Sequence, residues 1–223
     1  MDRRRAIRRT YDRIADRFAR TREYPWPEFD EFVADAPDGE LGLDVGCANG
    51  RHFRGLARRT DRVVGVDVSR ELLSVALERL PVDDPDSDST TPVAPVALLQ
   101  GDATNLPIAT GRVDLAAYVA TIHHLPDRAE RIRTLDELAR VLAPDGRALV
   151  SAWSTTHDRF DRESGFDTVV DWTLPDGESV PRFYHIYDFE EFRADLADSD
   201  LVVVDAYLSS GNCYGEVIGP DRE

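Results

Sequence analysis

The sequence predicts an α/β domain built on a mostly parallel sheet, with helices on both faces and a helical N-terminal extension. Through the middle of the chain, short apolar segments of strand length alternate with segments of helical periodicity, which is the pattern of such sheets. Two adjacent apolar runs near the end, 201–208 and 213–218, are expected to add an antiparallel hairpin. The 223 residues are 42% hydrophobic, enough for a sizeable core.

We expect one domain over residues 1–223, because no repeat and no long linker divides the sequence. Within it, residues 1–39 are the helical extension and residues 40–153 the parallel core. Residues 154–223 are expected to form a loop on the substrate side, followed by a closing helix and the hairpin.

The N-terminal extension is predicted to contain two helices. Apolar side chains recur in it at the spacing of one helical face: Ile7, Tyr11, Ile14 and Phe18. We therefore expect an amphipathic helix over residues 3–20. The prolines around Trp26 end this helix, and a short second helix follows through Phe32 before a turn at 37–39.

Five apolar segments predict the strands of the parallel sheet: 41–45, 62–67, 93–99, 113–119 and 148–153. Ser69 is expected to cap a helix that reaches Leu80, and Asp188 a helix that reaches Leu196. Asp127 and Glu130 resemble a capping box before a helix that runs to Leu142. The remaining connections are expected to be an acidic loop at 81–92, a turn at 144–146 and a polar, irregular segment at 155–182.

The charge of the chain is strongly negative and unevenly distributed. All 27 basic residues are arginine, 43 residues are acidic, and the formal net charge is −16. A lysine-free, acidic composition is typical of halophilic proteins, because concentrated salt screens self-repulsion. Residues 1–30 hold nine arginines against six acids, so this arm either meets phosphate groups or forms a solvated helix face.

Several classes of protein are excluded by the composition. No apolar run approaches the ~20 residues of a membrane helix, and no apolar segment follows Met1 as in a secretory signal. We therefore expect a cytoplasmic protein without membrane association. Cys47 and Cys213 are the only cysteines, too few for a disulfide framework or a zinc site.

The strongest chemical signal is the segment from Asp44 to Gly50, directly after the first strand. Glycines at a strand-to-helix turn let the backbone approach a ligand closely, and the next helix offers free N–H groups to an anion. Gly46 and Gly50 are four residues apart, which is not the spacing of the dinucleotide-binding motif. Alone, such a loop is weak evidence for a ligand.

Two acids at later strand ends strengthen the prediction. Asp67 ends the second strand, where an acid can bind both hydroxyls of a ribose, and Asp102 follows the third. One such aspartate could simply cap a helix. Acids at three successive strand ends favour a ligand site, because open α/β sheets bind ligands at this edge.

Residues 40–153, with this loop and these acids, resemble the class I S-adenosylmethionine-dependent methyltransferases. The resemblance implies a Rossmann-like sheet and S-adenosylmethionine as cofactor. In that family, residues matching Asp44, Gly46 and Gly50 surround the methionine part of the cofactor. The residue matching Asp67 holds the ribose, and the one matching Asp102 meets the adenine amine. The cofactor site is thereby predicted to comprise Asp44, Gly46, Cys47, Asn49, Gly50, Asp67, Val68, Asp102 and Ala103.

The flanking segments resemble one subfamily, whose members methylate the carboxylate of 5-carboxymethyluridine at the wobble position of tRNA. The matching segments are 11–22, Trp26-Pro27, 122–125, Trp153, 182–185 and Asn212. Cys213 departs from the family, which often has tryptophan there. The resemblance makes tRNA the expected substrate.

A carboxylate acceptor is ionised at pH 7, so its methylation requires no general base. Catalysis then consists of orientation and desolvation, and a pair of guanidinium groups is a natural clamp for the planar carboxylate. Arg22 and Arg182 are the candidates, with surface salt bridges as the alternative. The predicted catalytic set is Arg22, Arg182, His123, His124 and Asn212, without a metal.

His123 and His124 follow the fourth strand, and we expect that only one of them points into the site. Aromatic side chains could stack on a splayed base: Tyr11, Trp26, Trp153 and Tyr184. For Tyr11, packing in the core of its helix is the favoured interpretation.

Two other functions are compatible with the cofactor motifs. The enzyme could methylate a small carboxylate, phenol or quinone precursor, because this fold serves many acceptors. The chain could also be a non-catalytic methyltransferase-like subunit, although the complete series Asp44, Asp67 and Asp102 argues against it.

The resemblance also implies a partner. In the family's usual sheet order the third strand, Val93–Leu99, lies at an edge, and it carries no charge that would prevent pairing. The acidic loop 81–92 could cover this edge, and Pro95 protects it in part. The alternative is that another chain covers it, because the resembling tRNA methyltransferases work with a small zinc-binding activator that docks on this side. We therefore expect a heterodimer.

Overall fold

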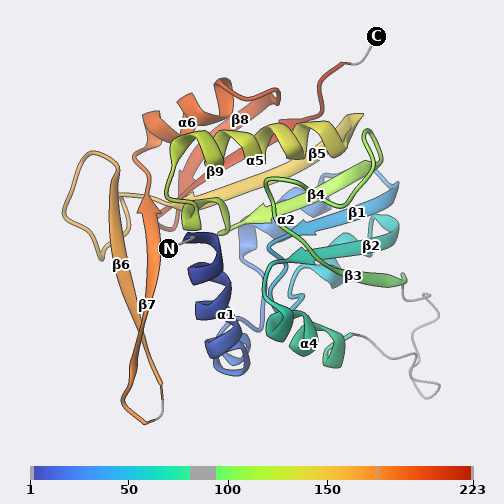
Figure 1. Cartoon of the computed structure of the whole chain (residues 1–223). Coiled ribbons are helices and arrows are strands. Elements are labelled where there is room, and N and C mark those ends of the chain that lie inside the picture. The colour runs from blue at the N-terminus through green and yellow to red at the C-terminus, as the bar shows by residue number, and fades with distance from the viewer. Residues whose placement is uncertain (1–2, 81–93, 175, 222–223) are drawn as a thin grey trace.

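The computed structural model describes residues 3–80, 94–174 and 176–221. Seven strands form one sheet in the order β3-β2-β1-β4-β5-β9-β8 (Figure 1). Their bounds are β1 Gly39–Val45, β2 Thr60–Asp67, β3 Val96–Gln100, β4 Val113–Val119, β5 Leu142–Trp153, β8 Val202–Ser209 and β9 Asn212–Ile218. β1 to β5 pair in parallel, and β9 pairs antiparallel with both β5 and β8. The predicted fold class is confirmed.

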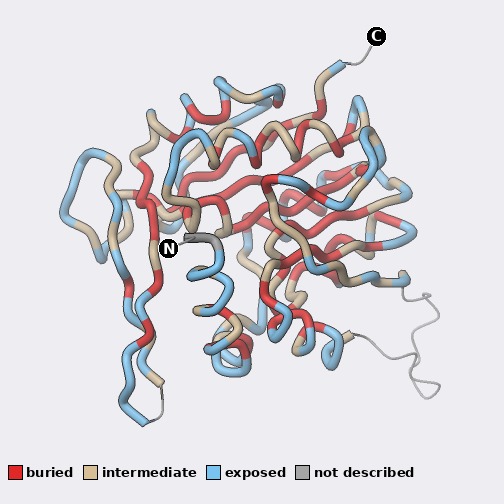
Figure 2. The backbone as a smooth tube through the Cα atoms, in the orientation of Figure 1, coloured by how far each residue is buried: buried red, intermediate tan, exposed pale blue. Residues whose placement is uncertain are grey.

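Helices cover both faces of this sheet. Their bounds are α1 Arg3–Arg20, α2 Pro27–Ala34, α3 Phe53–Leu56, α4 Arg70–Glu78, α5 Arg128–Val141 and α6 Phe189–Ala197, with a 3₁₀ turn, η1, at Ile122–His124. Leu135 and Phe192 bring α5 and α6 into the core on one face. Phe29, Phe53 and Leu73 bring α2, α3 and α4 into the core on the other. Figure 2 shows the buried residues running through the central strands. No helix in the described ranges is long and apolar enough to cross a membrane.

Two predicted helix caps are confirmed, and the third is confirmed in its position but not in its side-chain hydrogen bond. The Ser69 hydroxyl accepts the Leu72 N–H, and the Asp188 carboxylate accepts the Glu191 N–H. Asp127 stands at the N-cap of α5 but makes no capping hydrogen bond with its side chain. This helix also ends before Leu142, the first residue of β5.

β5 begins earlier than predicted because it continues through the segment 144–146, for which the sequence predicted a turn. Its pairing with β4 is irregular there: Val113 pairs with Leu142, and the next pair joins Leu115 to Arg147. A bulge in one long strand therefore takes the place of the turn. At the sheet's edge, β3 begins at Val96, whereas the acidic loop 81–92 and Val93 lie outside the described residues.

The prediction of an irregular segment at 155–182 is wrong for two stretches from Phe166 onward, which form strands. Residues Phe166–Thr173 (β6) and Ser179–Ile186 (β7) form an antiparallel hairpin outside the main sheet, which stands beside α1 in Figure 1. Along β6, half-buried or buried residues alternate strictly with exposed ones. This alternation is the period of a ribbon with one covered face, and β7 packs against α1 and η1.

Polar contacts hold α1 across the carboxyl ends of the strands. The Ser69 hydroxyl donates to Asp12 of α1 at 2.7 Å. The Asn49 amide donates to the carbonyls of Ala19 and Arg22 at 3.0 and 2.9 Å. Since Asn49 belongs to the glycine loop after β1, the end of α1 is fixed directly to that loop.

A buried ion-pair network fixes η1 from the other side. Arg131 of α5 is 3% exposed and contacts Asp195 at 3.3 Å and Glu191 at 3.0 Å, both on α6. The same guanidinium donates to the carbonyls of Leu125 and Pro126, which follow η1. Breaking such a buried pair is costly, so the position of the residues after β4 is coupled to the packing of two helices.

Candidate active site

A pocket lies where the carboxyl ends of β1, β2, β3 and β4 meet. The sheet order changes direction between β1 and β4, which is the switch point where open α/β sheets bind ligands. The pocket is lined by the loop after β1, by Asp67 and Val68 after β2, by residues 101–103 after β3 and by residues 119–121 after β4. Ile7, Tyr11 and Phe18 of α1 form its outer wall.

The loop after β1 is a tight cradle that excludes side chains. Gly46 and Gly50 have φ values of 71° and 75°, and Ala48 between them has 46°. A Cβ on Gly46 would lie 2.3 Å from the Thr121 hydroxyl, and one on Gly50 would lie 2.4 Å from the Phe53 ring. Larger residues would therefore meet both a steric clash and a backbone conformation that L-residues avoid.

Asp67 organises this loop from the end of β2. Its two carboxylate oxygens accept the N–H groups of Ala48 at 2.9 Å and Ser69 at 2.8 Å. The side chain is buried and lines the pocket. Burial raises the pKa of Asp67 to about 6, although the two N–H groups oppose this change by stabilising the charge.

Asp44 does not line the pocket and is connected to it by His52. Asp44 is 1% exposed, and both of its oxygens lie 3.2 Å from His52 Nδ1. Because a carboxylate accepts there, Nδ1 carries the proton. His52 itself lines the pocket, and its buried Nε2 has no hydrogen-bond partner among the described residues.

Most of the nine residues that were predicted to form the cofactor site line the pocket directly. Seven of the nine line the pocket, and Asp44 and Gly50 lie behind it. Asp102 accepts the N–H and the hydroxyl of Thr104 through one oxygen. Cys47 is buried, and burial raises the pKa of its thiol well above the ordinary value, so the thiol is neutral at pH 7.

Contrary to the expectation that only one would point inward, His123 and His124 both line the pocket. Successive residues of the 3₁₀ turn that carries them point about 120° apart, and the pocket wraps around this corner. His123 Nδ1 accepts the Trp153 N–H at 3.0 Å. His124 Nδ1 lies 3.0 Å from the Phe183 carbonyl and must donate, so its Nε2 accepts the Tyr11 hydroxyl at 2.8 Å.

Both histidines are neutral at pH 7. Burial lowers the pKa of His124 to about 4 and that of His123 well below its ordinary value. Tyr11 is buried, as its predicted core role requires, and its hydroxyl also contacts the site. Neither histidine is poised to titrate near neutral pH.

A second pocket adjoins the first and contains Arg182. Ile7, Tyr11 and His124 line both pockets. Arg182 is 5% exposed, donates to the Tyr184 hydroxyl at 2.6 Å and lies against the Trp172 and Tyr184 rings. In the described part of the chain it has no carboxylate partner, and its buried Nε has no acceptor.

Arg22 and Asn212 lie elsewhere. Arg22 lines the first pocket and donates to the Thr21 carbonyl at 3.1 Å, so the two candidate guanidinium groups line different pockets. Asn212 begins β9 and donates to the Ser210 carbonyl, with its buried Oδ1 unpartnered among the described residues. It lines neither pocket.

All four predicted aromatic residues line the first pocket. Trp153 and Tyr184 stack on one another, with centroids 4.8 Å apart and an interplanar angle of 17°. Tyr11 and Trp26 contribute from α1 and the segment that follows it. The pocket therefore has flat apolar surfaces beside a few buried polar groups, as small-molecule sites generally do.

Three further residues line the first pocket and were not predicted from the sequence: Arg51, His52 and Thr121. Arg51 lies over the Trp26 ring, and burial lowers its pKa to about 10. Arg51 and His52 directly follow the glycine loop, so their position in the sequence was an available signal. Thr121 could not be found in this way, because only the fold brings it against Gly46.

Comparisons with known proteins identify the family. A family model described as a methyltransferase domain matches residues 43–150. A protein from Encephalitozoon cuniculi that is named as a methyltransferase is 30% identical, over 90% of this chain and 89% of that protein. The chain belongs to the S-adenosylmethionine-dependent methyltransferases. The fold agrees: the S-adenosylmethionine-bound amino pentose methyltransferase from Micromonospora echinaspora superimposes with a TM-score of 0.61 at 20% identity, over 92% of this chain and 96% of that one.

Among methyltransferases, the curated relatives include tRNA (carboxymethyluridine(34)-5-O)-methyltransferases. The one from Saccharomyces cerevisiae is 30% identical over 79% of this chain and 59% of that protein. The chain spans about a fifth of the length of the vertebrate relatives of this name. A Haloferax volcanii methyltransferase, solved in complex with the Trm112 methyltransferase activator, has the same fold, with a TM-score of 0.69 at 17% identity over 97% and 99% of the two chains.

The pocket of this methyltransferase fits S-adenosylmethionine by its own chemistry. Gly46 lines the pocket without a side chain, so it presents its backbone to a ligand. Asp67 and Asp102 present carboxylates to a cofactor rich in hydroxyl and amine donors. Among the described residues, no group of three or more His, Cys, Asp and Glu side chains could hold a metal ion.

We expect the affinity for S-adenosylmethionine to fall as the pH drops through about 6. Asp67 has a pKa of about 6, and only its ionised form can accept bonds from N–H groups and hydroxyls on both oxygens. Affinity should therefore rise with pH through this value and level off above it. Asp67→Asn should lose the pH dependence and weaken binding at least tenfold, because a charge-assisted bond contributes about 1.5–3 kcal/mol.

Isothermal titration calorimetry between about pH 5 and pH 8 measures this dependence. Asp61→Asn, at an exposed position on the same strand, is the matched control and should behave as wild type. Circular dichroism confirms that each variant is folded. Retention of wild-type affinity and pH dependence by folded Asp67→Asn would contradict the assignment.

Proposed function

We propose that this methyltransferase transfers a methyl group from S-adenosylmethionine to the carboxylate of 5-carboxymethyluridine at the wobble position of tRNA. Two kinds of support converge on this acceptor. Relatives with this activity in their names match most of the chain. The observation that carries the proposal is Arg182, a buried cation without a carboxylate partner in the described residues, beside the cofactor pocket.

A carboxylate is the acceptor group that best satisfies Arg182. A buried guanidinium is costly unless it is paired and hydrogen-bonded. Here one nitrogen bonds the Tyr184 hydroxyl and Nε is unsatisfied. A bound carboxylate would supply the missing charge and the missing acceptor. The wall that Tyr11 and His124 share with the first pocket would place this carboxylate next to the cofactor.

The other residues of the site orient the acceptor rather than move protons. His123 and His124 are neutral, with lowered pKa values. The proposed acceptor carboxylate is already ionised at pH 7, so the reaction needs no base to remove a proton from it. His124 holds the Tyr11 hydroxyl, and His123 holds the backbone N–H of Trp153, through the hydrogen bonds described above. The stacked Trp153 and Tyr184 rings offer a surface for a pyrimidine base.

When bound, S-adenosylmethionine supplies an electrophilic methyl group attached to a sulfonium. Asp67 and Asp102 would accept its ribose hydroxyls and adenine amine, and the loop from Gly46 to Asn49 would pack against its methionine part. These contacts fix the direction of approach, and well-aligned approach of two reactants contributes about 7–11 kcal/mol to lowering the barrier. Burial of the site removes water from both reactants.

Transfer of radioactive methyl groups tests the proposal directly. Labelled S-adenosylmethionine is incubated with the enzyme and either total tRNA or a small-molecule extract. We expect label in tRNA, released as methanol by mild alkali because the product is an ester. Label only in the extract would identify a small acceptor. Tight cofactor binding without transfer to either would show a non-catalytic chain.

In this assay Arg182→Gln should lower kcat/KM for tRNA at least about tenfold, because one charge-assisted bond contributes about 1.5–3 kcal/mol. Affinity for S-adenosylmethionine should be unchanged, since Arg182 lines only the second pocket. Arg193→Gln, at an exposed arginine of α6, is the control. A folded Arg182→Gln enzyme with wild-type kcat/KM would remove Arg182 from the acceptor site.

We further propose that a small zinc-binding activator protein covers the edge strand β3. As predicted from the sequence, β3 lies at one edge of the seven-stranded sheet. Val96 and Leu98 are half-buried on the side of α4, and Ala97 is exposed. No charged side chain interrupts residues 94–99, so the strand is open to pairing by β-augmentation. The structurally similar Haloferax volcanii methyltransferase was solved in complex with the Trm112 methyltransferase activator.

Ala97→Asp, at the exposed position of β3, should reduce co-purification of the chain with a co-expressed activator and reduce the solubility that co-expression confers. The charge would stand at an edge that is meant to be covered, and its burial is costly. Val204→Asp is the matched control, because Val204 is 58% exposed on the opposite edge strand, β8. A monodisperse, fully active isolated chain would contradict the proposal, as would equal co-purification of the two variants.

A further inference from the structure

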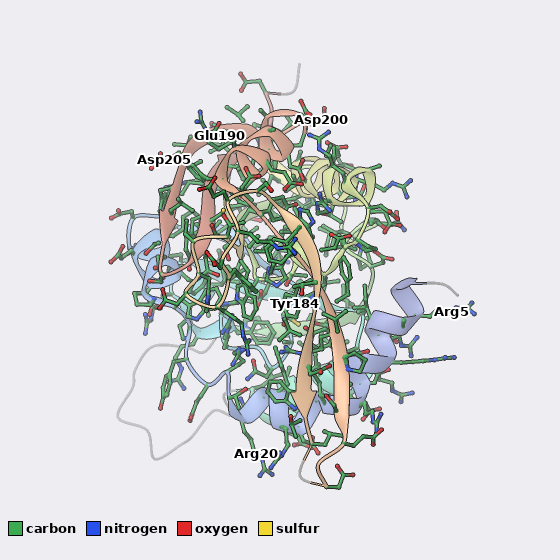
Figure 3. All side chains as sticks on the ribbon, turned by 90° about the vertical axis from the view of Figure 1, so that its left-hand side faces the viewer. Arg5, Arg20, Tyr184, Glu190, Asp200 and Asp205 are labelled. Atoms are coloured by element: carbon green, nitrogen blue, oxygen red, sulfur yellow. The ribbon has the colours of Figure 1, made fainter. Side chains whose placement is uncertain are left out.

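α1 carries a continuous stripe of arginines on the face opposite the active site. Arg5, Arg9, Arg13, Arg17 and Arg20 recur every three or four residues and are all exposed, so they lie along one side of the helix. We call these five residues the arginine stripe. Figure 3 shows Arg5 and Arg20 at the two ends of α1, both directed away from the body of the protein.

Three of the five arginines in the stripe have no acidic partner among the residues that the structure describes. Arg13 pairs with Glu178 of the β6–β7 hairpin, and Asp16 lies on the same face of the helix. Arg9, Arg17 and Arg20 form no ion pair with any described residue. Residues 3–20 contain eight arginines and two aspartates, in a chain whose net charge is −16.

Acidic and basic side chains are not evenly mixed over the surface of the protein. The labelled acids Glu190, Asp200 and Asp205 lie at the end of the molecule opposite to α1 in Figure 3. A surface adapted only for solubility would intersperse the two signs of charge. A concentration of arginines on one helix of an acidic protein is instead the electrostatic footprint of a polyanion site.

The position of the stripe connects it to the active site. The opposite face of the same helix supplies Ile7, Tyr11 and Phe18 to the pocket, and a helix is only about 10–12 Å thick. From Arg5 to Arg20 the stripe is about 22 Å long, at about 1.5 Å per residue. A polyanion lying on it would pass beside the second pocket, whose rim includes Ala6 and Thr10 of α1.

We propose that the arginine stripe binds the phosphate backbone of the substrate RNA and sets the direction from which the acceptor nucleotide enters the second pocket. This inference rests on the proposed function. Arginine suits the role because its planar fork bonds two phosphate oxygens at once. Backbone contacts of this kind position a nucleic acid without reading its sequence, so recognition of the acceptor base is left to the pocket.

The test compares Arg9→Ala/Arg17→Ala with wild type in binding an unmodified tRNA transcript over a series of salt concentrations. Each lost phosphate contact should reduce the slope of log K against log[salt] by about 0.7–0.9, so the double variant should lose about 1.5. Affinity at the lowest salt should fall at least about tenfold, with affinity for S-adenosylmethionine unchanged. Alanine preserves the helix, which circular dichroism verifies.

Arg62→Ala/Arg193→Ala is the matched control. Both arginines are more than half exposed and each has one acidic neighbour at 3.5 Å, but they lie on β2 and α6. This variant should bind the transcript with wild-type affinity and slope. In the methyl-transfer assay, the stripe variant should raise KM for tRNA and leave kcat nearly unchanged.

The outcomes test RNA binding by the arginine stripe separately from the proposed methylation of tRNA. A stripe variant with wild-type slope and KM overturns the stripe, even if tRNA is methylated. Stripe-dependent RNA binding by an enzyme that methylates no RNA keeps the stripe and removes the proposed acceptor. A wild-type chain that binds no RNA and self-associates through α1, as sedimentation would show, overturns the stripe and makes a second acidic copy its occupant.

Discussion

The attachment of α1 across the carboxyl edge of the sheet is the constraint on which the rest of the site depends. Three polar contacts hold it: Tyr11 to His124, Asp12 to Ser69, and the backbone of Ala19 and Arg22 to Asn49. Each partner belongs to a segment that follows a different parallel strand. The helix therefore lines both pockets with one face and presents its arginines to solvent with the other.

Local pattern predicted the parallel core, because its determinants lie close together in the sequence. The strands before Asp44 and Asp67 are short apolar runs, and the cap at Ser69 acts within three residues. The glycine loop was recognised for the same reason. Gly46 and Gly50 adopt positive φ values, which glycine accommodates most easily, so the two glycines mark the turn in the sequence itself. The partnership of Asp44 with His52 and the contact of Thr121 with Gly46 depend on packing, so no pattern indicated them.

The β6–β7 hairpin was missed because polar and charged residues interrupt its apolar pattern. The buried positions of β7 include Val180, Arg182, Tyr184 and Ile186, alternating along the strand. An arginine at an inward position breaks the apolar alternation by which a strand is recognised, and exposed Asp167 and Asp171 give β6 a polar appearance. The residue that hid the strand, Arg182, is the one that the strand carries into the second pocket. Conflicts between local pattern and structure are expected where a site is being built.

In the proposed reaction, the charge of Arg182 would favour binding of the substrate over binding of the product. A carboxylate entering the second pocket would neutralise a buried cation and satisfy its unpaired Nε, so binding favours the ionised acceptor. Methylation converts that carboxylate into a neutral ester, which removes the charge-assisted part of the contact. In the proposed reaction, the guanidinium that would select the substrate would therefore hold the product weakly. The neutral His123 and His124 supply no compensating charge, so release requires no further residue to change its protonation.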